Sequence, residues 1–297
     1  MPPIVLLSFD METDIGSWTA GYEGLRHGTP RILDVLNNQQ VPATFFFIGE
    51  AASGHPGIVR IVADAGHEVG CHTLQHETVG DVMFPLPGVK TVLPEECAHR
   101  LAVATDAVQQ VLGAKVTSFR APRLWGSTNM VNALEELGYT ADATYPLFFY
   151  QQRLAPYHPS NIDWTAEGDL RILEIPNFAD LTIDSTDPHG RDRDQWPRFR
   201  TEGAEALMSH IDNMLPVYQA AGLPTVISLY MHPWEFHQMP ARIAHSEAII
   251  YPAEFLTKHT GERAVTELDR LIRLFKERQA TFTTACKLAM GDAALTG

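Results

Sequence analysis

The stretch PIVLLSFDMETD, residues 3–14, decides the fold class because an uninterrupted apolar run leads directly into a cluster of acids. Residues 3–9 are typical of a strand that is buried on both faces, as the strands of a parallel sheet are. Asp10, Glu12 and Asp14 follow, and carboxylates so close repel one another unless a cation or an arginine neutralises them. If the strand continues that far, Asp10 and Glu12 point to the same side. The stretch therefore predicts a strand with a charged site at its carboxyl end; the alternative is an acidic turn in which Asp14 caps a helix.

Short apolar runs alternate with amphipathic segments along most of the chain, which predicts parallel strands joined by crossover helices. Strands are predicted at residues 3–9, 43–48, 67–71, 116–120, 139–143, 171–175 and 225–231. Helices are predicted at residues 29–38, 55–65, 94–112, 128–137, 202–221 and 263–278. Two segments rich in Pro, Asp, Arg, Trp and His, residues 148–168 and 183–200, are typical of long loops, which in a compact domain are often functional. We find no repeat or linker that splits the chain, and we expect one α/β domain.

The composition excludes several classes of partner. The chain of 297 residues carries 22 Lys and Arg against 36 Asp and Glu, a formal charge of −14. A sequence-independent nucleic-acid binder needs a cationic face, and docking on anionic lipid needs basic clusters. No apolar run approaches the ~18–20 residues of a membrane span. The start of the chain lacks the basic region of a signal peptide, and the three cysteines form no metal-type pair. We therefore expect a cytoplasmic protein without nucleic-acid or membrane partners; a homo-oligomer stays open.

A second polar cluster, His72-Thr73-Leu74-Gln75-His76, follows the predicted strand 67–71. Two histidines four residues apart meet on one face of a helical turn, so both imidazoles can reach one metal ion. The spacing alone is weak evidence, because a chain with 13 histidines contains such pairs by chance. Two solvated histidines in a loop are the alternative. Imidazoles together with a carboxylate suit Zn²⁺ or another first-row divalent ion.

Two further clusters also follow predicted strands. Arg120 is the last residue of the predicted strand 116–120; Pro122 follows it, and Trp125 is close in sequence. An arginine beside acids can hold one of them ionised and oriented, although a surface arginine before a turn is the alternative. His232 ends the apolar strand 225–231. A buried neutral histidine is common there, but beside acids it could act as a general acid near neutral pH.

In this order, the four clusters resemble the polysaccharide deacetylase family, also called the NodB-homology group or carbohydrate esterase family 4. The resemblance rests on Ser8-Phe9-Asp10, His72-Thr73-Leu74-Gln75-His76, Arg120-Ala121-Pro122 and Tyr230-Met231-His232, with flanking matches such as Ala43-Thr44-Phe45-Phe46, Ala65-Gly66-His67-Glu68-Val69-Gly70 and Glu174-Ile175-Pro176. It implies a distorted (β/α) barrel of about seven parallel strands. It further implies a single catalytic domain over residues 1–297, with a motif-bearing core at about 4–237 that the C-terminal helix and strand complete.

The resemblance also implies an activity, the metal-dependent removal of acetyl groups from N-acetylated sugars of a glycan. His72, His76 and one carboxylate, Glu12 or Asp14, would hold a divalent ion, with Zn²⁺ expected. The family pattern has two adjacent acids, whereas Met11 follows Asp10 here, so both later acids stay open as ligands.

The resemblance assigns the proton transfers to three residues. Asp10, held by Arg120, would take a proton from water, and His232 would protonate the leaving amine. Four further side chains are expected to contact the substrate: Trp18, Tyr22, Pro122 and Trp125.

Two other functions remain open on this sequence. A ring-opening amidohydrolase that acts on allantoin or cyclic imides shares the fold, and a small diffusible amide suits a cytoplasmic enzyme. A catalytically silent carbohydrate-binding protein is the third reading, supported only by the irregular first motif. Which sugar or amide is the substrate, and whether an N- or O-acetyl group is removed, is not specified by the sequence.

Overall fold

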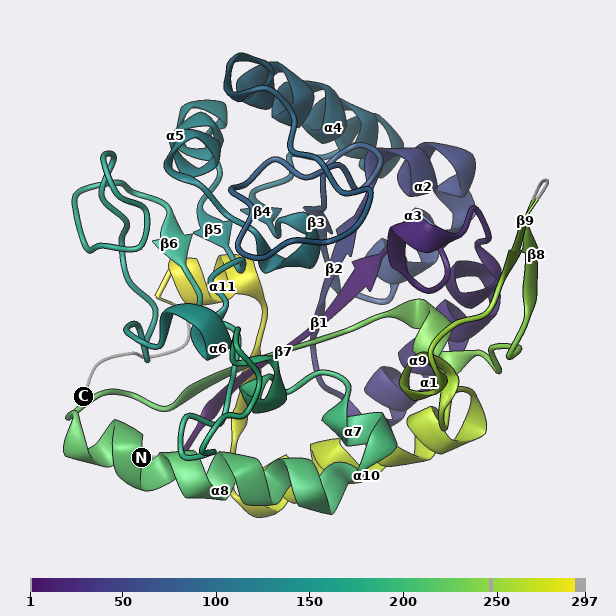
Figure 1. Cartoon of the computed structure of the whole chain (residues 1–297). Coiled ribbons are helices and arrows are strands. Elements are labelled where there is room, and N and C mark those ends of the chain that lie inside the picture. The colour runs from purple at the N-terminus through teal and green to yellow at the C-terminus, as the bar shows by residue number, and fades with distance from the viewer. Residues whose placement is uncertain (1, 246–247, 292–297) are drawn as a thin grey trace.

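A curled parallel sheet forms the centre of the computed structural model, which describes residues 2–245 and 248–291 (Figure 1). Its eight strands are β1 (Ile4–Met11), β2 (Thr44–Phe47), β3 (Glu68–Cys71), β4 (Ser118–Phe119), β5 (Ala141–Asp142), β6 (Leu173–Glu174), β7 (Val226–Met231) and β10 (Thr281–Thr283). Strands β1 to β6 are neighbours in chain order, and β7 pairs with the free side of β1. A parallel bridge between Asn177 and Ser228 joins the segment after β6 to β7. The sheet thus curls back on itself, and the predicted barrel of about seven parallel strands is confirmed.

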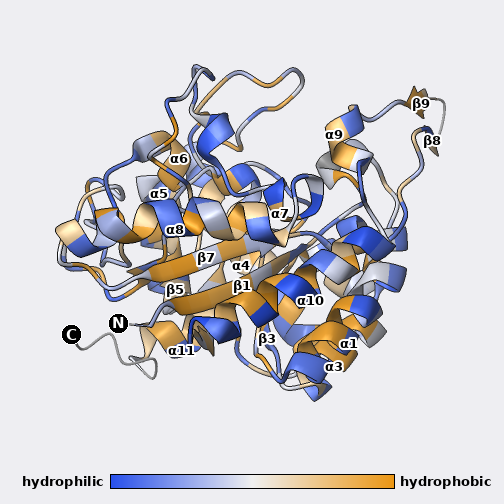
Figure 2. Cartoon of the chain, turned by 90° about the horizontal axis from the view of Figure 1, so that it is seen from below, coloured by the Kyte–Doolittle hydropathy of each residue, from blue (hydrophilic) through white to orange (hydrophobic). Residues whose placement is uncertain are grey.

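Helices surround this sheet; most cover its outside, and the last one packs against side chains inside the barrel (Figure 1). They are α1 (Thr29–Gln39), α2 (Gly49–Gly54), α3 (Pro56–Asp64), α4 (Cys97–Leu112), α5 (Thr128–Leu137), α6 (Leu147–Tyr150), α7 (Arg198–Thr201), α8 (Ala204–Ala220), α9 (Glu254–Thr257), α10 (Glu262–Glu277) and α11 (Ala285–Ala289). A two-stranded antiparallel hairpin, β8 (Ile243–His245) with β9 (Ala248–Ile250), extends from the body. In Figure 2 the strands are predominantly apolar, whereas the helices alternate between apolar and polar residues, as amphipathic helices packed on a sheet do. No helix in the described ranges combines the length and the apolar character that crossing a membrane requires.

Strand β1 is buried along its whole length, and its two sets of side chains enter different environments. Val5, Leu7 and Phe9 pack in the main core with the helices. Ile4 and Leu6 pack in a separate small cluster, with Phe46, Leu173, Val226 and side chains of α11. Because successive side chains of a strand point to opposite faces, the even-numbered residues of β1 face the inside of the barrel. That parity continues to the end of the strand.

The C-terminal segment joins the same sheet. Strand β10 pairs with the first half of β1, and β2 pairs with the second half, so both lie along one side of it. Helix α10 packs against α1 and α8.

The predicted elements differ from the structure mainly at their ends. Strands β4, β5 and β6 contain two residues each instead of the five predicted. Helix α2 was not predicted, and residues 94–96 form a 3₁₀ turn before α4. The two predicted loops are largely irregular but contain short helical turns, α6 at the start of the first and a 3₁₀ turn with α7 in the second.

Candidate active site

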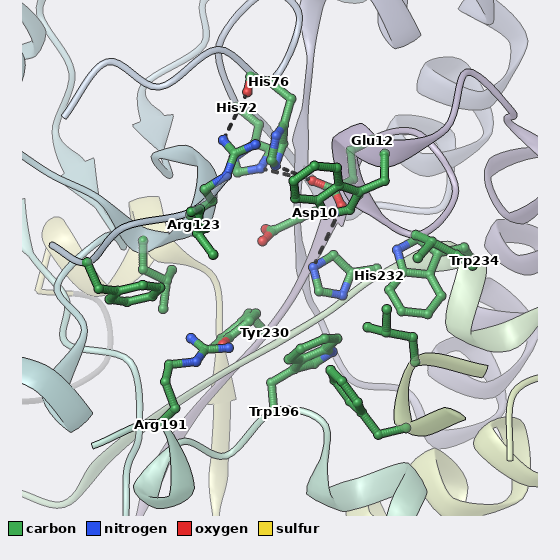
Figure 3. Close-up of a pocket in the computed structure, with 18 residues that line it drawn as sticks. Asp10, Glu12, His72, His76, Arg123, Arg191, Trp196, Tyr230, His232 and Trp234 are labelled. Carbon is green, nitrogen blue, oxygen red and sulfur yellow. Dashed lines mark hydrogen bonds and ion pairs between the residues drawn. The ribbon is translucent and has the colours of Figure 1, made fainter. Parts of the chain in front are cut away.

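A cavity of about 330 Å³ lies at the carboxyl ends of the barrel strands (Figure 3). Its polar lining consists of Asp10, Glu12, His72, His76, Arg123, Arg191, Tyr230 and His232. Its apolar lining includes Trp18, Phe84, Trp196, Trp234, Phe255 and Leu256. Polar groups that converge in a concave, mostly apolar pocket are the usual arrangement of a binding or catalytic site.

Asp10 and Glu12 reach this cavity because β1 continues to Met11, two residues beyond the predicted end. Both acids have the even parity that faces the barrel interior, while Met11 between them packs in the main core. Since the strand continues as far as Met11, the carboxylates of Asp10 and Glu12 lie on the same side, as predicted for that case. Met11, which separates the two acids in the sequence, packs in the core and does not separate their carboxylates in the cavity.

Glu12 forms a compact group with the two predicted histidines. Its Oε2 lies 2.7 Å from His76 Nε2 and 3.5 Å from His72 Nε2. One ligand atom from each of the three residues lies within 4.8 Å of the others, and all three side chains are buried. His72 Nδ1 donates to the Arg120 carbonyl over 2.7 Å, which turns His72 Nε2 towards Glu12. Such a second hydrogen bond is what orients metal-binding histidines in proteins.

The protonation states of this group suit a cation. Burial by itself would raise the pKa of Glu12, but His76 and His72 beside it hold the pKa well below its usual range. Burial lowers the pKa of His76, which favours the neutral imidazole. A carboxylate with two imidazoles is the donor set of many zinc sites that keep a coordination position open. The residues present therefore fit a divalent metal ion.

The segment 72–76 and the neighbouring turn at 123–124 contain backbone conformations that L residues rarely adopt. Thr73 and His76 have φ values of 68° and 61°, and Arg123 and Leu124, on the neighbouring turn, both have 62°. Left-handed conformations of non-glycine residues cost roughly 1 kcal/mol or more each and cluster at functional sites. Surrounding contacts hold the two turns, among them Arg123 Nη1, which donates to Thr78 Oγ1 over 3.0 Å. The strain indicates that the site is formed in advance of ligand binding.

Arg120 lies behind Asp10 and does not line the cavity. It is fully buried, and its Nη1 donates to Asp10 Oδ1 over 2.9 Å and to Ser8 Oγ over 2.7 Å. Its Nη2 donates to Asn177 Oδ1, and its Nε to the Ala143 carbonyl. Charge-assisted bonds of this kind fix both the charge and the direction of a carboxylate. Asp10 is thus presented to the cavity as an oriented acceptor.

A pair of buried acids, Asp142 and Glu174, lies at the ends of β5 and β6 beside Thr144. Burial raises the pKa of Asp142 to about 7, and burial together with the charge of Asp142 raises the pKa of Glu174 well above its usual range. Thr144 Oγ1 donates to Asp142 and accepts from the backbone N of Ala121. The pair therefore holds at least one proton near neutral pH and supports the turn that follows Arg120.

Replacement of Asp142 by asparagine is expected to flatten the pH dependence of stability. Because both carboxyl pKa values are raised on folding, their contribution is present below the unfolded values near 4 and is lost as the pH rises through about 7. The wild-type free energy of unfolding should fall by on the order of a few kcal/mol between about pH 5 and pH 8. Urea unfolding at both pH values tests this. Asp64→Asn, an exposed acid on α3, is the control; an equal fall in both variants would contradict the shared proton.

His232 lies across the cavity from His72 and His76 (Figure 3). Its Nε2 is 3.9 Å from Glu12 Oε1, and its Nδ1 donates to Glu235 Oε1 over 3.0 Å. Burial alone would lower the pKa of His232, but Glu235 and Glu12 raise it to about 8. Glu235 is fully buried and also accepts from Trp196 Nε1 and Arg200 Nε. The raised pKa favours protonated His232 at neutral pH, and Glu235 fixes the orientation of its ring.

Besides Arg120, which lies behind Asp10, four residues predicted for the site do not line this cavity, and Trp18 is the predicted aromatic residue that does line it. Asp14 accepts from the backbone N of Glu23 and of Gly24 and does not join the group of Glu12, His72 and His76 among the described residues. The structure therefore favours Glu12 over Asp14 as ligand because Asp14, two residues beyond Glu12, has left the strand. Tyr22 contacts His55, while Trp125 and Pro122 are buried in the core around the turn that follows β4.

Several residues of the cavity were not assigned roles by the sequence analysis: Phe84, Arg123, Arg191, Trp196, Tyr230 and Trp234. Arg123 directly follows the Arg-Ala-Pro motif, and Trp234 and Glu235 follow His232, so adjacency to the motifs was an available signal. Arg191 and Trp196 belong to segment 183–200, which was predicted to be a long loop of a kind that is often functional. Phe84 carried no signal.

The sequence is similar to known deacetylases, in most cases over part of its length. Residues 2–141 match the family model of polysaccharide deacetylase. The chain is 40% identical over 74 residues to a peptidoglycan-N-acetylglucosamine deacetylase of Bacillus cereus and 30% identical over 111 residues to a chitooligosaccharide deacetylase of Azorhizobium caulinodans. These matches cover 25% and 37% of this chain and only 27% and 48% of those relatives. A peptidoglycan deacetylase of Helicobacter pylori matches at 26% identity over 88% of this chain and 93% of its own length.

Solved structures share the fold over the whole chain. A protein from Mycobacterium smegmatis assigned as a polysaccharide deacetylase superposes with a TM-score of 0.63 at 19% identity and covers 97% of this chain and 89% of its own. An allantoinase superposes with a TM-score of 0.65 at 16% identity, over 99% and 92% of the two chains. At these identities the likeness concerns the fold alone. Residues 2–141, just under half of the chain, match the polysaccharide deacetylase family model, and the resemblance to the Helicobacter pylori relative extends over most of the chain.

Proposed function

We propose that this protein is a metal-dependent hydrolase that removes acetyl groups from N-acetylated sugars of a glycan. The observation that carries the proposal is the single cavity that Glu12, His72 and His76 share with Asp10 and His232. The relatives from Bacillus cereus and Azorhizobium caulinodans, named for deacetylation of peptidoglycan and of chitooligosaccharides, support the reaction class.

Glu12, His72 and His76 would hold the divalent ion, with Zn²⁺ expected. When bound, the ion supplies Lewis-acid polarisation of the acyl carbonyl and makes a water molecule more acidic. Asp10, oriented by Arg120, accepts the proton of the attacking water. Because Arg120 remains paired with Asn177 and the Ala143 carbonyl, it stays in place when the charge of Asp10 changes.

His232 then donates its Nε2 proton to the leaving nitrogen as the tetrahedral intermediate collapses. Glu235 keeps Nδ1 protonated and the ring in position, so it is a positioning residue. The buried Arg200 compensates the charge of Glu235 through a 2.8 Å contact.

A second candidate function is ring opening of a small cyclic amide by the same residues. The observation that favours it is the size and lining of the cavity. A volume of about 330 Å³ is at the lower end of ligand pockets. Its walls include Trp18, Trp196 and Trp234, which suits a molecule with one ring. The chemistry at the carbonyl is the same in both cases.

A substrate panel on the metal-loaded protein separates the candidates. We expect acetate release from N-acetylated chito-oligomers or peptidoglycan fragments, measured as kcat/KM, with O-acetylated sugars as a comparison. Turnover confined to allantoin, hydantoin or succinimide would replace the first proposal by the second. Binding of chito-oligomers without any turnover, by protein with a full complement of metal, would support a silent carbohydrate-binding protein instead.

We further propose that residues 1–297 act as one catalytic domain in the cytoplasm. The pairing of β10 with β1 and the packing of α10 against α1 and α8 support one domain. All three cysteines are free thiols, and two are buried, which suits a reducing compartment. Subcellular fractionation of the native protein tests the location.

A further inference from the structure

Arg191 is a fixed cation in the wall of the cavity, on the side away from His72 and His76 (Figure 3). Its Nη1 lies 3.2 Å from Asp194 Oδ2, and about 33% of its side chain is exposed. The carbon at the centre of its guanidinium group lies 4.9 Å from the centroid of the Phe148 ring. Tyr230 donates its hydroxyl proton to the same Asp194 oxygen over 2.5 Å. One side of the guanidinium group is therefore held by buried groups, while another faces the cavity.

Within the described residues, the acids that line the cavity are paired with groups other than Arg191. Asp10 and Glu12 are the acids among the described residues that line it. Asp10 is paired with Arg120, and Glu12 with His72 and His76. Arg191 is paired with Asp194 on its buried side, and Arg123 is a second cation in the lining. Five tryptophan and phenylalanine side chains line the same cavity: Trp18, Phe84, Trp196, Trp234 and Phe255. In such apolar surroundings a charge-assisted hydrogen bond is stronger than in water.

From this placement we propose that Arg191 binds a carboxylate of the substrate, so that the hydrolysed amide belongs to an anionic molecule rather than a neutral one. The inference rests on the proposed amide hydrolysis and adds the substrate class. A guanidinium group carries five N–H donors in a plane that matches a carboxylate in a bidentate geometry. Since Arg191 and the reacting groups line the same small cavity, the carboxylate and the amide would lie within one compact molecule or one sugar residue.

Matched ligands test the proposal by binding, without turnover. N-acetylmuramic acid and N-acetylglucosamine differ by a carboxylate-bearing lactyl group, and succinamate and succinamide differ by one carboxylate in place of an amide. Titration of the metal-free protein, followed by the fluorescence of the tryptophans in the cavity, gives a dissociation constant for each. We expect the carboxylate-bearing member of at least one pair to bind more tightly, and Arg191→Gln to weaken that binding by about 10- to 100-fold while it changes the binding of the neutral member by less than about threefold.

A structural role for Arg191 predicts a different result. Arg191→Gln leaves Asp194 buried without its partner, so the double variant Arg191→Gln/Asp194→Asn removes both charges together and is the second test. It should fold and should show the same loss of carboxylate preference. Arg193→Gln, in the same 3₁₀ turn but outside the cavity lining, should retain the preference. Equal changes for both members of each pair, or no preference in the wild type, would overturn the proposal.

Activity measurements distinguish a failure of the Arg191 proposal from a failure of the proposed amide hydrolysis. On the metal-loaded protein, kcat/KM for the matched substrates should show the same preference, with the Arg191→Gln effect mainly in KM. Loss of carboxylate preference in Arg191→Gln together with no hydrolysis of any amide would sink the reaction but keep Arg191 as an anion-binding residue. Amide hydrolysis without any carboxylate preference would support the proposed reaction but overturn the role of Arg191 in binding a carboxylate.

Discussion

Replacement of His76 by alanine is expected to abolish tight binding of a divalent ion and, with it, amide hydrolysis. His76 Nε2 lies 2.7 Å from Glu12 Oε2, so the substitution removes one of three candidate ligands from the centre of the group. Changes to groups that only support a ligand typically cost roughly 10–100-fold in metal affinity or activity, and loss of a ligand should cost more. The measurement is the metal-to-protein ratio after dialysis, by elemental analysis, together with kcat/KM on the best substrate of the panel.

The control for this prediction is His99→Ala. His99 is exposed on α4, away from the cavity, so its loss tests for adventitious surface binding by histidine. Metal content and turnover should stay at wild-type values in His99→Ala. Wild-type metal content and turnover in His76→Ala would show that Glu12, His72 and His76 are not the metal site.

Asp10→Asn is expected to differ from His76→Ala in its metal content: the metal should be retained while turnover is lost. Asp10 accepts a bond from Arg120 but is not part of the group of Glu12, His72 and His76. The amide keeps the shape of the side chain and can accept from Arg120, yet it cannot take a proton from water. General-base catalysis contributes about 10²–10⁴-fold, so kcat should fall by that amount. Single-turnover kinetics on metal-loaded protein measures it.

Asp14→Asn is the matched control because Asp14 is a buried acid from the same cluster that the structure places outside the cavity. Its carboxylate caps the backbone N–H groups of Glu23 and Gly24. The substitution should lower stability while the metal content and kcat of the folded protein stay close to wild type. A metal loss in Asp14→Asn would restore Asp14 as a ligand, and normal turnover in Asp10→Asn would remove Asp10 as the base.

The fold could be predicted where a segment's own pattern determines its structure. The long apolar runs of β1, β2 and β7 were predicted to within two residues of their bounds, because a buried strand needs no partner to be recognised. Strand β10, Thr281–Thr283, is short and polar at two of three positions. It is a strand because β1 lies beside it, and that contact is tertiary. The hairpin of β8 and β9 forms a separate two-stranded sheet and was not predicted from the sequence.

The site residues also differ in whether the local sequence pattern or a long-range contact places them. Asp10, Glu12, His72, His76 and His232 follow strands directly, so the strand geometry alone directs them to one end of the barrel. Arg191 and Trp196 lie on an irregular segment without periodicity, and only the complete path of that segment brings them to the cavity. Glu235 could be seen beside His232, but its contact with Arg200 depends on how α7 packs.

The position of β1 in the sheet has a consequence for how the protein is made. Ile4 pairs with Val226 and with Thr281, which the ribosome adds 222 and 277 residues later. At a synthesis rate of ~5–20 residues per second, the apolar first strand waits about 10–45 s for β7. During that interval its unpaired edge resembles an aggregation-prone segment. Contacts between residues so distant in sequence also make folding slow. We therefore expect the nascent chain to depend on a holding chaperone until β7 and β10 have been synthesised.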